Sequence, residues 1–196
     1  MKNLITFREI KIEDAKILLN WRRKKRISEF QFTDINNSLV NQKKWIKNSY
    51  NNNNYYHWMI LLKKKPIGFF NINNIDIMKK KASWAWYIGS DKHISLGGFI
   101  PPYFYNWVFS FLNIDKLDIF VFTKNTNVIK IHNIHGYKAY KKKYFIKKNK
   151  KKISYIKMYL LKKNWNFDMY KKYDTKFPIS LWKTNIISIK NEKEKN

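Results

Sequence analysis

The chain of 196 residues has no cysteine, and it has only five glycines, four prolines and four alanines. The absence of cysteine excludes thiol nucleophiles, disulfides and thiolate metal ligands. Long apolar runs are also absent. No stretch approaches the roughly 18 residues of a membrane-spanning helix, and the N-terminal MKNLITFREIKIED lacks the apolar core of a signal peptide. We therefore expect a cytoplasmic protein that does not associate with membranes.

Acidic residues are scarce relative to basic ones. Thirteen Asp and Glu stand against forty-one Lys and Arg, so the formal charge is +28. Thirty-seven of the cations are Lys, spread from Lys2 to Lys195, whereas a nucleic-acid-binding protein usually gathers cations on one face and uses Arg for bidentate phosphate contacts. The charge is either compositional drift, since Lys, Asn and Ile have codons rich in A and T, or a weak attraction for an anionic substrate. In both cases we expect no specific nucleic-acid partner.

Aromatic and other hydrophobic residues are plentiful, at 18% and 44% of the chain. This is enough for the core of one domain and little for two. The regular succession of apolar segments ends near Trp165. We therefore predict one domain over residues 1–165 and a C-terminal appendage over residues 166–196, with a disordered end at NEKEKN.

The spacing of apolar residues predicts seven strands and four helices. The strands span residues 3–10, 55–62, 66–75, 82–88, 116–123, 137–146 and 153–161, and the helices span 12–25, 38–50, 103–112 and 125–135. Leu39, Trp45 and Ile46 are expected on the apolar side of the second helix. Pro101 and Pro102 fit the first turn of the third helix, where proline is tolerated.

A glycine pair, Gly97-Gly98, lies between the strand 82–88 and the third helix. Together with the order of strands and helices, this arrangement resembles the GCN5-related N-acetyltransferases, or GNAT family. The resemblance implies an α/β fold with a mixed, mostly antiparallel sheet of about seven strands flanked by about four helices. In that fold the sheet is splayed between the fourth and fifth strands, and acetyl-CoA is the co-substrate.

A second motif supports the same family. Asn125, at the start of the fourth helix, and the pair Gly136-Tyr137 reproduce the family's N-x10-G-F spacing. We expect Asn125 to hold the pantetheine arm or to position His132 through its amide, although Asn is also an ordinary helix cap. The resemblance assigns backbone N–H groups near Tyr87 and Ile88 to the oxyanion. It places the pyrophosphate on backbone N–H groups at the helix start, where glycine permits close approach. The residues expected to bind it are Leu96, Gly97, Gly98, Phe99 and Ile100.

The chain departs from the family pattern at two places. The loop before the glycine pair, residues 93–96, lacks the usual Gln or Arg, and Pro101 and Pro102 remove two backbone donors. The diphosphate is therefore expected to rest on the backbone N–H groups of residues 96–100. Many members also have Tyr seven residues after the Asn, where this chain has His132.

The acetyl transfer that the family performs needs a neutral amine, a donor for the developing oxyanion and an acid for the coenzyme A thiolate. We expect His132 to protonate the thiolate, either as the cation or through its neutral N–H. Two other readings of His132 remain open, packing on the helix and a metal site with His135, although no carboxylate lies near them in the sequence and we expect no metal. The resemblance places Asn71 near the accepting amine, and Asp76, after the third strand, is expected to help deprotonate that amine directly or through water.

Four segments carry a closer resemblance within the family. They are LLNWRRK (18–24), SWAWYIG (83–89), LGGFIPPYFYNWVF (96–109) and NVIKIHNIHGYK (127–138). These segments resemble the UDP-4-amino-4,6-dideoxy-N-acetyl-β-L-altrosamine N-acetyltransferases of pseudaminic acid biosynthesis. The resemblance implies acetylation of the 4-amino group of a UDP-linked sugar, in a pathway that supplies a nonulosonic acid for glycosylating flagellin or cell-surface polymers.

The closer resemblance also implies a nucleotide-sugar site. It assigns Arg22 to phosphate, Phe32 and Trp45 to the faces of the uracil or the sugar, and Gln42 to polar contacts. The alternatives are that Arg22 is a solvated helix residue and that Phe32 and Trp45 belong to the core. A homodimer is compatible with this reading.

Two other functions remain open. The WRR segment of the first helix also resembles ribosomal-protein N-terminal acetyltransferases, which share the fold, whereas LGGFIPPYFYNWVF favours the sugar enzyme. The third reading is a non-catalytic basic protein, which predicts salt-sensitive affinity for nucleic acid and no binding of acetyl-CoA.

Overall fold

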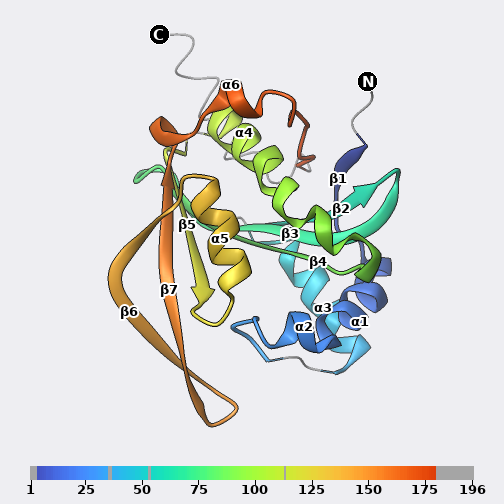
Figure 1. Cartoon of the computed structure of the whole chain (residues 1–196). Helices are drawn as coiled ribbons and strands as arrows, with labels where there is room; N and C mark the ends of the chain where they lie inside the picture. Colours follow the sequence, from blue (N-terminus) through green and yellow to red (C-terminus); the bar gives the residue numbers. More distant parts are fainter. Residues whose placement is uncertain (1–3, 35–36, 53, 113, 180–196) are drawn as a thin grey trace.

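The computed structural model describes residues 4–34, 37–52, 54–112 and 114–179, which form one seven-stranded sheet with its helices (Figure 1). The strands are β1 (Ile5–Glu9), β2 (Tyr55–Leu62), β3 (Lys65–Asp76), β4 (Lys81–Ile88), β5 (Lys116–Phe122), β6 (Lys138–Lys148) and β7 (Lys151–Leu161). Their order is β1-β2-β3-β4-β5-β7-β6, and neighbours are antiparallel except β4 and β5, which are parallel. The predicted mixed, mostly antiparallel sheet is confirmed.

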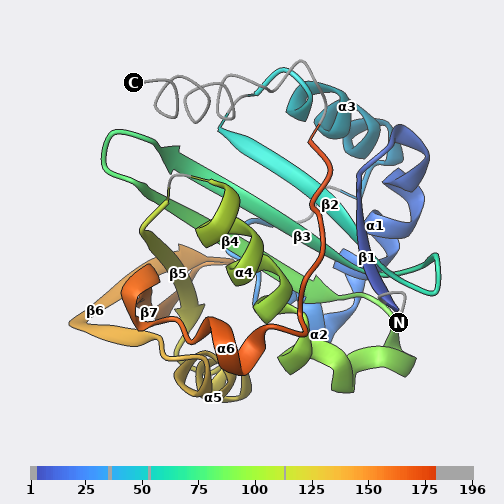
Figure 2. The same ribbon diagram turned by 90° about the horizontal axis from the view of Figure 1, so that it is seen from above.

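Helices cover both faces of this sheet. They are α1 (Ala15–Arg23), α2 (Lys25–Ser28), α3 (Leu39–Ser49), α4 (Pro101–Phe111), α5 (Thr126–Ile134) and α6 (Phe167–Tyr170), with the 3-10 segments η1 (Ile12–Asp14), η2 (Asp91–Phe99) and η3 (Lys162–Asn164). Figures 1 and 2 show α4 and α6 on one face of β1–β4 and α1, α2 and α3 on the other. Each face has its own buried cluster, with Phe104 and Phe109 of α4 in one and Leu18 of α1 and Ile46 of α3 in the other. No helix in the described ranges is long and apolar enough to cross a membrane.

The predicted helix 12–25 is interrupted. It forms η1, α1 and α2, and Lys24 between α1 and α2 is extended, with φ −62° and ψ 126°. The Lys24 ammonium donates a hydrogen bond to the carbonyl of Gly89, which is 65 positions away in the sequence. Such a break cannot be read from helical periodicity, because the contacts that compensate for it are distant in the chain. Its consequence is that α2 lies against the end of β4.

The apolar side predicted for α3 is wrong in part. Leu39 and Trp45 are 38% and 40% exposed, and the buried side consists of Gln42, Ile46 and Ser49. These three residues are four and three positions apart, so they lie on one face of the helix. The Ser49 hydroxyl donates to the Ile46 carbonyl at 2.7 Å, which compensates for its burial. Because two of the three buried residues are polar, the pattern of apolar residues did not indicate the buried face of α3.

Residues 166–179, which the sequence assigns to an appendage, pack on the core. Phe177 is 3% exposed and stacks on Phe7 with ring centroids 3.9 Å apart. The indole N–H of Trp58 donates to the carbonyl of Pro178 at 2.7 Å, and Figure 2 shows residues 171–179 crossing the sheet. The boundary at residue 165 stays a prediction, and the NEKEKN end lies outside the described residues.

Candidate active site

Strands β4 and β5 separate after a short parallel contact. Their pairing runs from Lys81 with Lys116 to Ser83 with Asp118, and Figure 1 shows the strands diverging beyond it. On its other edge, β4 stays paired with β3 as far as Ile88. The predicted splay between the fourth and fifth strands is confirmed, and beyond Ser83 this edge of β4 has no strand partner among the described residues.

Alternation along β4 decides which N–H groups face this opening. Ala85 and Gly89 donate their N–H groups to β3, at 2.9 and 2.8 Å. Because N–H groups alternate along a strand, those of Trp86 and Ile88 point toward the opening and that of Tyr87 points toward β3. Of the two predicted oxyanion donors, the register therefore favours Ile88. Trp86 is a further candidate that sequence reasoning missed.

The glycine loop leads into α4 at the wide end of the splay. Gly97 is buried, and a Cβ there would lie 3.0 Å from the Trp86 ring, so glycine avoids a tight contact. A Cβ at Gly98 would have no atom within 4 Å. The backbone at Gly98 is thus open to an approaching ligand, as the phosphate assignment requires.

The other predicted members of the phosphate site differ in exposure. Leu96 is half-buried, Phe99 is 55% exposed and Ile100 is buried. Pro101 and Pro102 occupy the first turn of α4, as predicted, and both are buried. The side chains of Ile100 and the two prolines therefore anchor the start of α4 in the core, while the residues before them stay accessible.

His132 lies on α5, enclosed by aromatic rings. Its exposure is 2%, the centroids of the Trp84 and Tyr137 rings are 5.5 and 5.0 Å away, and its Nδ1 is 3.4 Å from the Tyr105 hydroxyl. Burial, and to a lesser extent the neighbouring His135, lowers the pKa of His132 to about 3. The imidazole is therefore neutral at pH 7, and of the two predicted forms of the acid only the neutral N–H remains.

A chain of polar groups connects His132 to β4. The indole N–H of Trp84 donates to the Tyr137 hydroxyl at 2.8 Å, and Tyr137 is hydrogen-bonded to Tyr105. Burial raises the pKa of Tyr105 and of Tyr137, so both hydroxyls stay protonated. Sequence reasoning missed Tyr105, because nothing in the sequence of α4 distinguishes its hydroxyl from those of Tyr103 and Ser110.

His135 connects the end of α5 to the glycine loop. Its ring is hydrogen-bonded to the backbone of Gly98, while burial lowers its pKa to about 4. Its Nδ1 is buried and has no hydrogen-bond partner among the described residues. Over the same part of the chain, no group of three or more His, Cys, Asp or Glu side chains is placed to hold a metal ion. His135 therefore lies beside the glycine loop, which it contacts at Gly98.

Asn125 is the N-cap residue of α5. Its side-chain oxygen accepts the Val128 N–H at 3.4 Å, which is the ordinary capping contact. Its role toward the pantetheine arm stays a prediction.

The structure does not bring Asn71 and Asp76 together. Asn71 lies opposite Ala85 in the open part of β4, and its side-chain oxygen accepts the Ala85 N–H. Asp76 lies opposite Lys81, on the other side of the point where β4 and β5 separate. Its carboxylate accepts the Lys79 N–H at 2.9 Å, so it caps the β3–β4 turn. The predicted role of Asp76 toward the amine has no support from this geometry.

Arg22 and Phe32 lie near each other through the loop after α2. Arg22 Nη2 donates to the Thr33 hydroxyl at 2.8 Å, and its Nε is buried without a partner among the described residues. Phe32 packs on Phe122 and Tyr155, with ring centroids 4.4 and 5.1 Å apart. Arg22 is therefore not a freely solvated side chain, and Phe32 belongs to an aromatic cluster at the ends of β5 and β7.

Gln42 and Trp45 lie on α3, apart from this cluster. Gln42 is 8% exposed, and the Trp45 ring lies 4.9 Å from His57 and 6.3 Å from Phe69. Neither residue lines the pocket described next.

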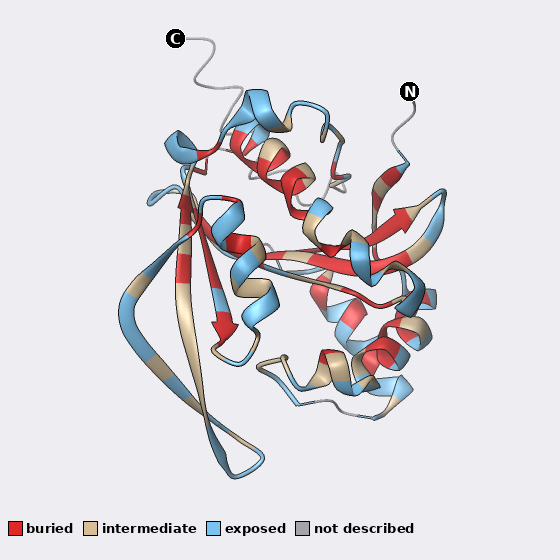
Figure 3. Cartoon of the chain, viewed as in Figure 1, coloured by how far each residue is buried: buried red, intermediate tan, exposed pale blue. Residues whose placement is uncertain are grey.

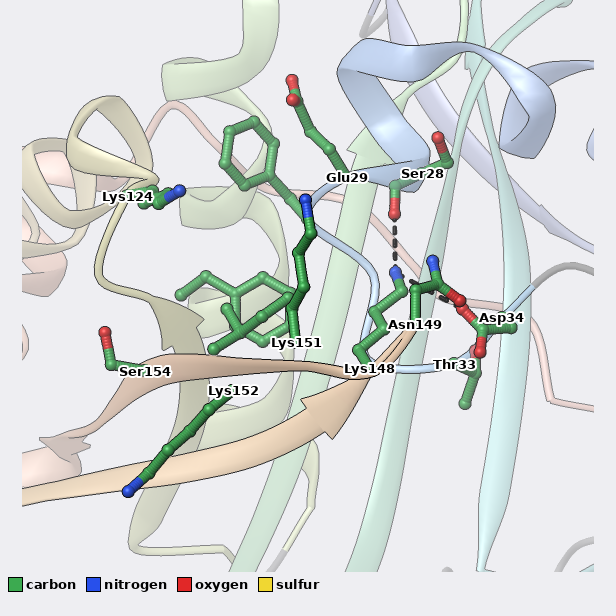
Figure 4. Close-up of a pocket in the computed structure, with 13 residues that line it drawn as sticks. Ser28, Glu29, Thr33, Asp34, Lys124, Lys148, Asn149, Lys151, Lys152 and Ser154 are labelled. Atoms are coloured by element: carbon green, nitrogen blue, oxygen red, sulfur yellow. Dashed lines mark hydrogen bonds and ion pairs between the residues drawn. The ribbon is translucent and has the colours of Figure 1, made fainter.

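A pocket of about 890 Å³ lies beyond the wide end of the splay (Figure 4). Residues of α2 and the loop after it form one wall, the end of β5 forms a second, and the β6–β7 hairpin forms the third. Lys148 joins two of these walls: its ammonium donates to the carbonyls of Ser28 at 2.9 Å and Gln31 at 2.6 Å and lies 3.9 Å from Asp34. The side chain of Lys148 is only 9% exposed, so this lysine holds the hairpin against the loop.

The pocket carries more positive than negative charge. Four lysines line it against two acidic residues, and the set is Lys124, Lys148, Lys151, Lys152, Glu29 and Asp34. The Lys152 ammonium lies over the Phe145 ring, whereas Lys124 and Lys151 have no hydrogen bond or ion pair to the described residues. Figure 4 shows both of these side chains extending into the space between the walls. The pocket therefore offers two unpaired ammonium groups to a ligand.

Comparison with known proteins identifies the class to which this arrangement belongs. The family model described as "Acetyltransferase (GNAT) domain" matches residues 5–138. No curated protein matches the chain in sequence. The chain therefore belongs to the GNAT acetyltransferase family, and it is an acetyl-CoA-dependent N-acetyltransferase.

Solved structures agree with this fold. Spermidine N-acetyltransferase from Vibrio cholerae, in complex with CoA and spermine, is 16% identical and superposes with a TM-score of 0.73, covering 82% of this chain and 97% of that one. A dodecameric structure of the spermidine N-acetyltransferase from Vibrio cholerae gives a TM-score of 0.68 at 16% identity, with coverages of 81% and 94%. At this identity the likeness concerns the fold and leaves the acceptor open.

Proposed function

We propose that this N-acetyltransferase acts on an amine carried by an anionic molecule, and that the acceptor is a UDP-linked 4-amino-4,6-dideoxy sugar of the pseudaminic acid type. The observation that carries the proposal is the lysine-lined pocket at the mouth of the splay. The resemblance of LGGFIPPYFYNWVF to the enzymes of that pathway supports it independently. We place the reaction in the cytoplasm, and a homodimer remains our expectation for any assembly.

The charge of the pocket argues against a polyamine acceptor. Two unpaired ammonium groups, Lys124 and Lys151, repel a polycation such as spermidine and attract a diphosphate. Glu29 is the carboxylate that remains once Asp34 is paired with Lys148. The structurally similar spermidine enzymes therefore share the fold of this chain without providing a model for its acceptor site.

Aromatic rings beside the pocket suit the remainder of a nucleotide. Phe30 and Phe122 line it, and Phe32 packs directly on Phe122. Flat rings next to cations are the usual combination for a base joined to phosphate. Arg22, which bonds the pocket residue Thr33, supports this wall and has an unpartnered Nε.

The proposed reaction is direct attack. The neutral amine forms a bond to the acetyl carbon, the carbon–sulfur bond breaks, the amine loses a proton to water, and the thiolate gains one. The N–H of Ile88, with that of Trp86, stabilises the oxyanion, since both face the opening. The neutral His132 ring donates a hydrogen bond to the sulfur, and the Tyr105 hydroxyl, which stays protonated, lies 3.4 Å from Nδ1 and fixes the tautomer of the ring. The proton that the thiolate gains is replaced from water. Asn71 would lie nearest the amine.

An acetyl-transfer assay with three acceptors tests the proposal. We expect turnover with a UDP-4-amino-4,6-dideoxy sugar and little with spermidine or with peptides that mimic ribosomal-protein N-termini. Preference for the peptides would favour the ribosomal reading, and preference for spermidine would overturn the charge argument. Absence of acetyl-CoA binding by calorimetry would overturn the enzymatic assignment as a whole.

A further inference from the structure

The turn at the end of β4 is held from three directions. The Gly89 N–H donates to the Ile67 carbonyl at 2.8 Å, and the Trp21 indole covers its Cα so closely that a Cβ would lie 1.9 Å from Cδ2. The Gly89 carbonyl accepts hydrogen bonds from Lys24 and Arg26, each at 2.9 Å. This turn connects the open edge of β4 to the glycine loop, so its position sets that of the loop.

Arg26 makes the central contacts. Its Nη1 donates to the Ile88 carbonyl at 2.8 Å, its Nη2 to the Gly89 carbonyl, and its Nε to Asp91 at 2.8 Å. Asp91 also accepts from Lys24, and these two cations lower the pKa of its carboxyl. The planar guanidinium presents its donors in a rigid fork, so Arg26 holds two carbonyls and a carboxylate in a fixed relative geometry, which a flexible ammonium group does not impose.

These contacts join the two halves of the proposed site. Arg26 belongs to α2, whose last residue, Ser28, begins the wall of the lysine-lined pocket. Ile88 is the residue whose N–H faces the opening, and Asp91 begins η2, which carries Gly97 and Gly98. N–H and C=O of one strand residue point to the same edge, so Arg26 occupies the carbonyl of Ile88 and leaves its N–H free for a ligand.

We propose that Arg26, supported by Lys24 and Asp91, is a positioning residue that fixes the β4 turn and the glycine loop relative to the acceptor pocket. The inference rests on the proposed function for its consequence, because only a bound donor and acceptor make the relative position matter. Loss of the guanidinium frees the Ile88 carbonyl and leaves Lys24 as the remaining cation on Gly89 and Asp91, so the loop that follows them is held less firmly. Acetyl-CoA affinity then falls although no group that touches the cofactor has changed.

The first experiment measures acetyl-CoA affinity by calorimetry in the wild-type protein, Arg26→Lys and Arg26→Gln. We expect the dissociation constant to rise about tenfold in Arg26→Gln, as for loss of a charge-assisted contact. Arg26→Lys should recover part of the affinity, because it keeps the charge and one carbonyl contact. The matched control is Arg23→Gln on the adjacent helix, whose hydrogen bonds to the described residues go to Asn37 alone, and which should bind as the wild type does.

A second experiment needs no ligand and separates this inference from the proposed function. Amide hydrogen exchange of residues 88–98 should accelerate in Arg26→Gln and not in Arg23→Gln, while the exchange of β2 and β3 is unchanged. Faster exchange together with weaker acetyl-CoA binding supports the inference. Arg26→Gln could instead lower the melting temperature and change neither the acetyl-CoA affinity nor the exchange of this loop. Arg26 would then contribute only to general stability, and the inference would be overturned. Should acetyl-transfer assays exclude UDP-sugars, the exchange result would still decide whether Arg26 holds the loop.

Discussion

Lysine residues are distributed differently at the two ends of the sheet. In β2, β3 and β4 the lysines are confined to strand ends and turns, at positions 63–65 and 79–81. Between residues 138 and 161, in the β6–β7 hairpin, there are ten lysines and no acidic residue, and they occupy the strands throughout. Figure 3 shows the first region mostly buried and the second mostly exposed or intermediate.

Coverage by helices explains this difference. A strand packed on both faces cannot hold an ammonium group at a buried position without a partner. The β6 strand is at the edge of the sheet, where lysine blocks pairing with another chain. Most lysines of the hairpin are therefore explained by its exposed position at the edge of the sheet. Only the lysines that line the pocket need another explanation. The donor site that we propose consists of backbone, glycine and aromatic groups, whereas the acceptor pocket that we propose is lined by charged side chains.

The largest expected effect tests the chemistry on the donor side. His132→Phe should lower kcat by roughly 10²- to 10⁴-fold, as for the loss of a group that assists proton transfer. Phenylalanine fits the aromatic surroundings of Trp84 and Tyr137, so the fold should persist. His132→Tyr should recover part of the rate, because it restores a donor. Single-turnover kinetics is the measurement, and an unchanged rate in the Phe variant would reduce His132 to packing.

The next effect tests the glycine loop. Gly98→Val should weaken acetyl-CoA binding by roughly 100-fold, because branched carbon atoms would occupy the space where phosphate approaches the backbone. The side chain meets no protein atom at its Cβ, so the melting temperature should stay close to that of the wild type. Gly97→Val is a poorer test, since it would press on Trp86. Unchanged affinity in a folded Gly98→Val protein would show that the loop assignment is wrong.

A smaller effect tests the acceptor side. The double variant Lys124→Gln with Lys151→Gln should raise the KM for the UDP-sugar about tenfold and leave that for acetyl-CoA unchanged. Its dependence on salt should also weaken. The double variant Lys43→Gln with Lys47→Gln, at two exposed positions of α3, is the control for the same change of net charge. A rise in the KM for acetyl-CoA instead would place the phosphates of the cofactor in this pocket.

The remaining test measures stability against pH and concerns α5 on the donor side. Burial lowers the pKa of His132 to about 3 and that of His135 to about 4, from 6.5 in the unfolded chain. Between these values the unfolded state binds more protons, so stability is present at pH 7 and is lost as the pH falls below 6.5. Each histidine contributes a slope of about 1.4 kcal/mol per pH unit. Denaturant unfolding from pH 7 to pH 4.5 should show this loss, and His132→Phe should reduce the slope.

Much of the fold could be predicted because its signals are local. Alternating apolar residues predict β2, β3 and β4, and Pro101 with Pro102 indicates the start of α4. The glycine pair and Asn125 belong to short motifs, in which neighbouring residues determine the turn or the helix cap. The break at Lys24 and the buried face of α3 were missed because contacts distant in the sequence, or polar residues with local partners, decide them.

The sequence by itself determined the class of fold, the place of the glycine loop and the excess of positive charge, since these follow from spacing and composition. Only the tertiary structure decided which charged side chains are paired within the protein and which face the pocket. It paired Lys148 with carbonyls of α2 and the loop after it, more than a hundred positions earlier, left Lys124 and Lys151 without an ion pair to the described residues, and placed Arg26 on the end of β4. It also made His132 neutral by enclosing it in aromatic rings. The physical reason is that burial and pairing of a charge depend on residues brought together by folding, which no local pattern records.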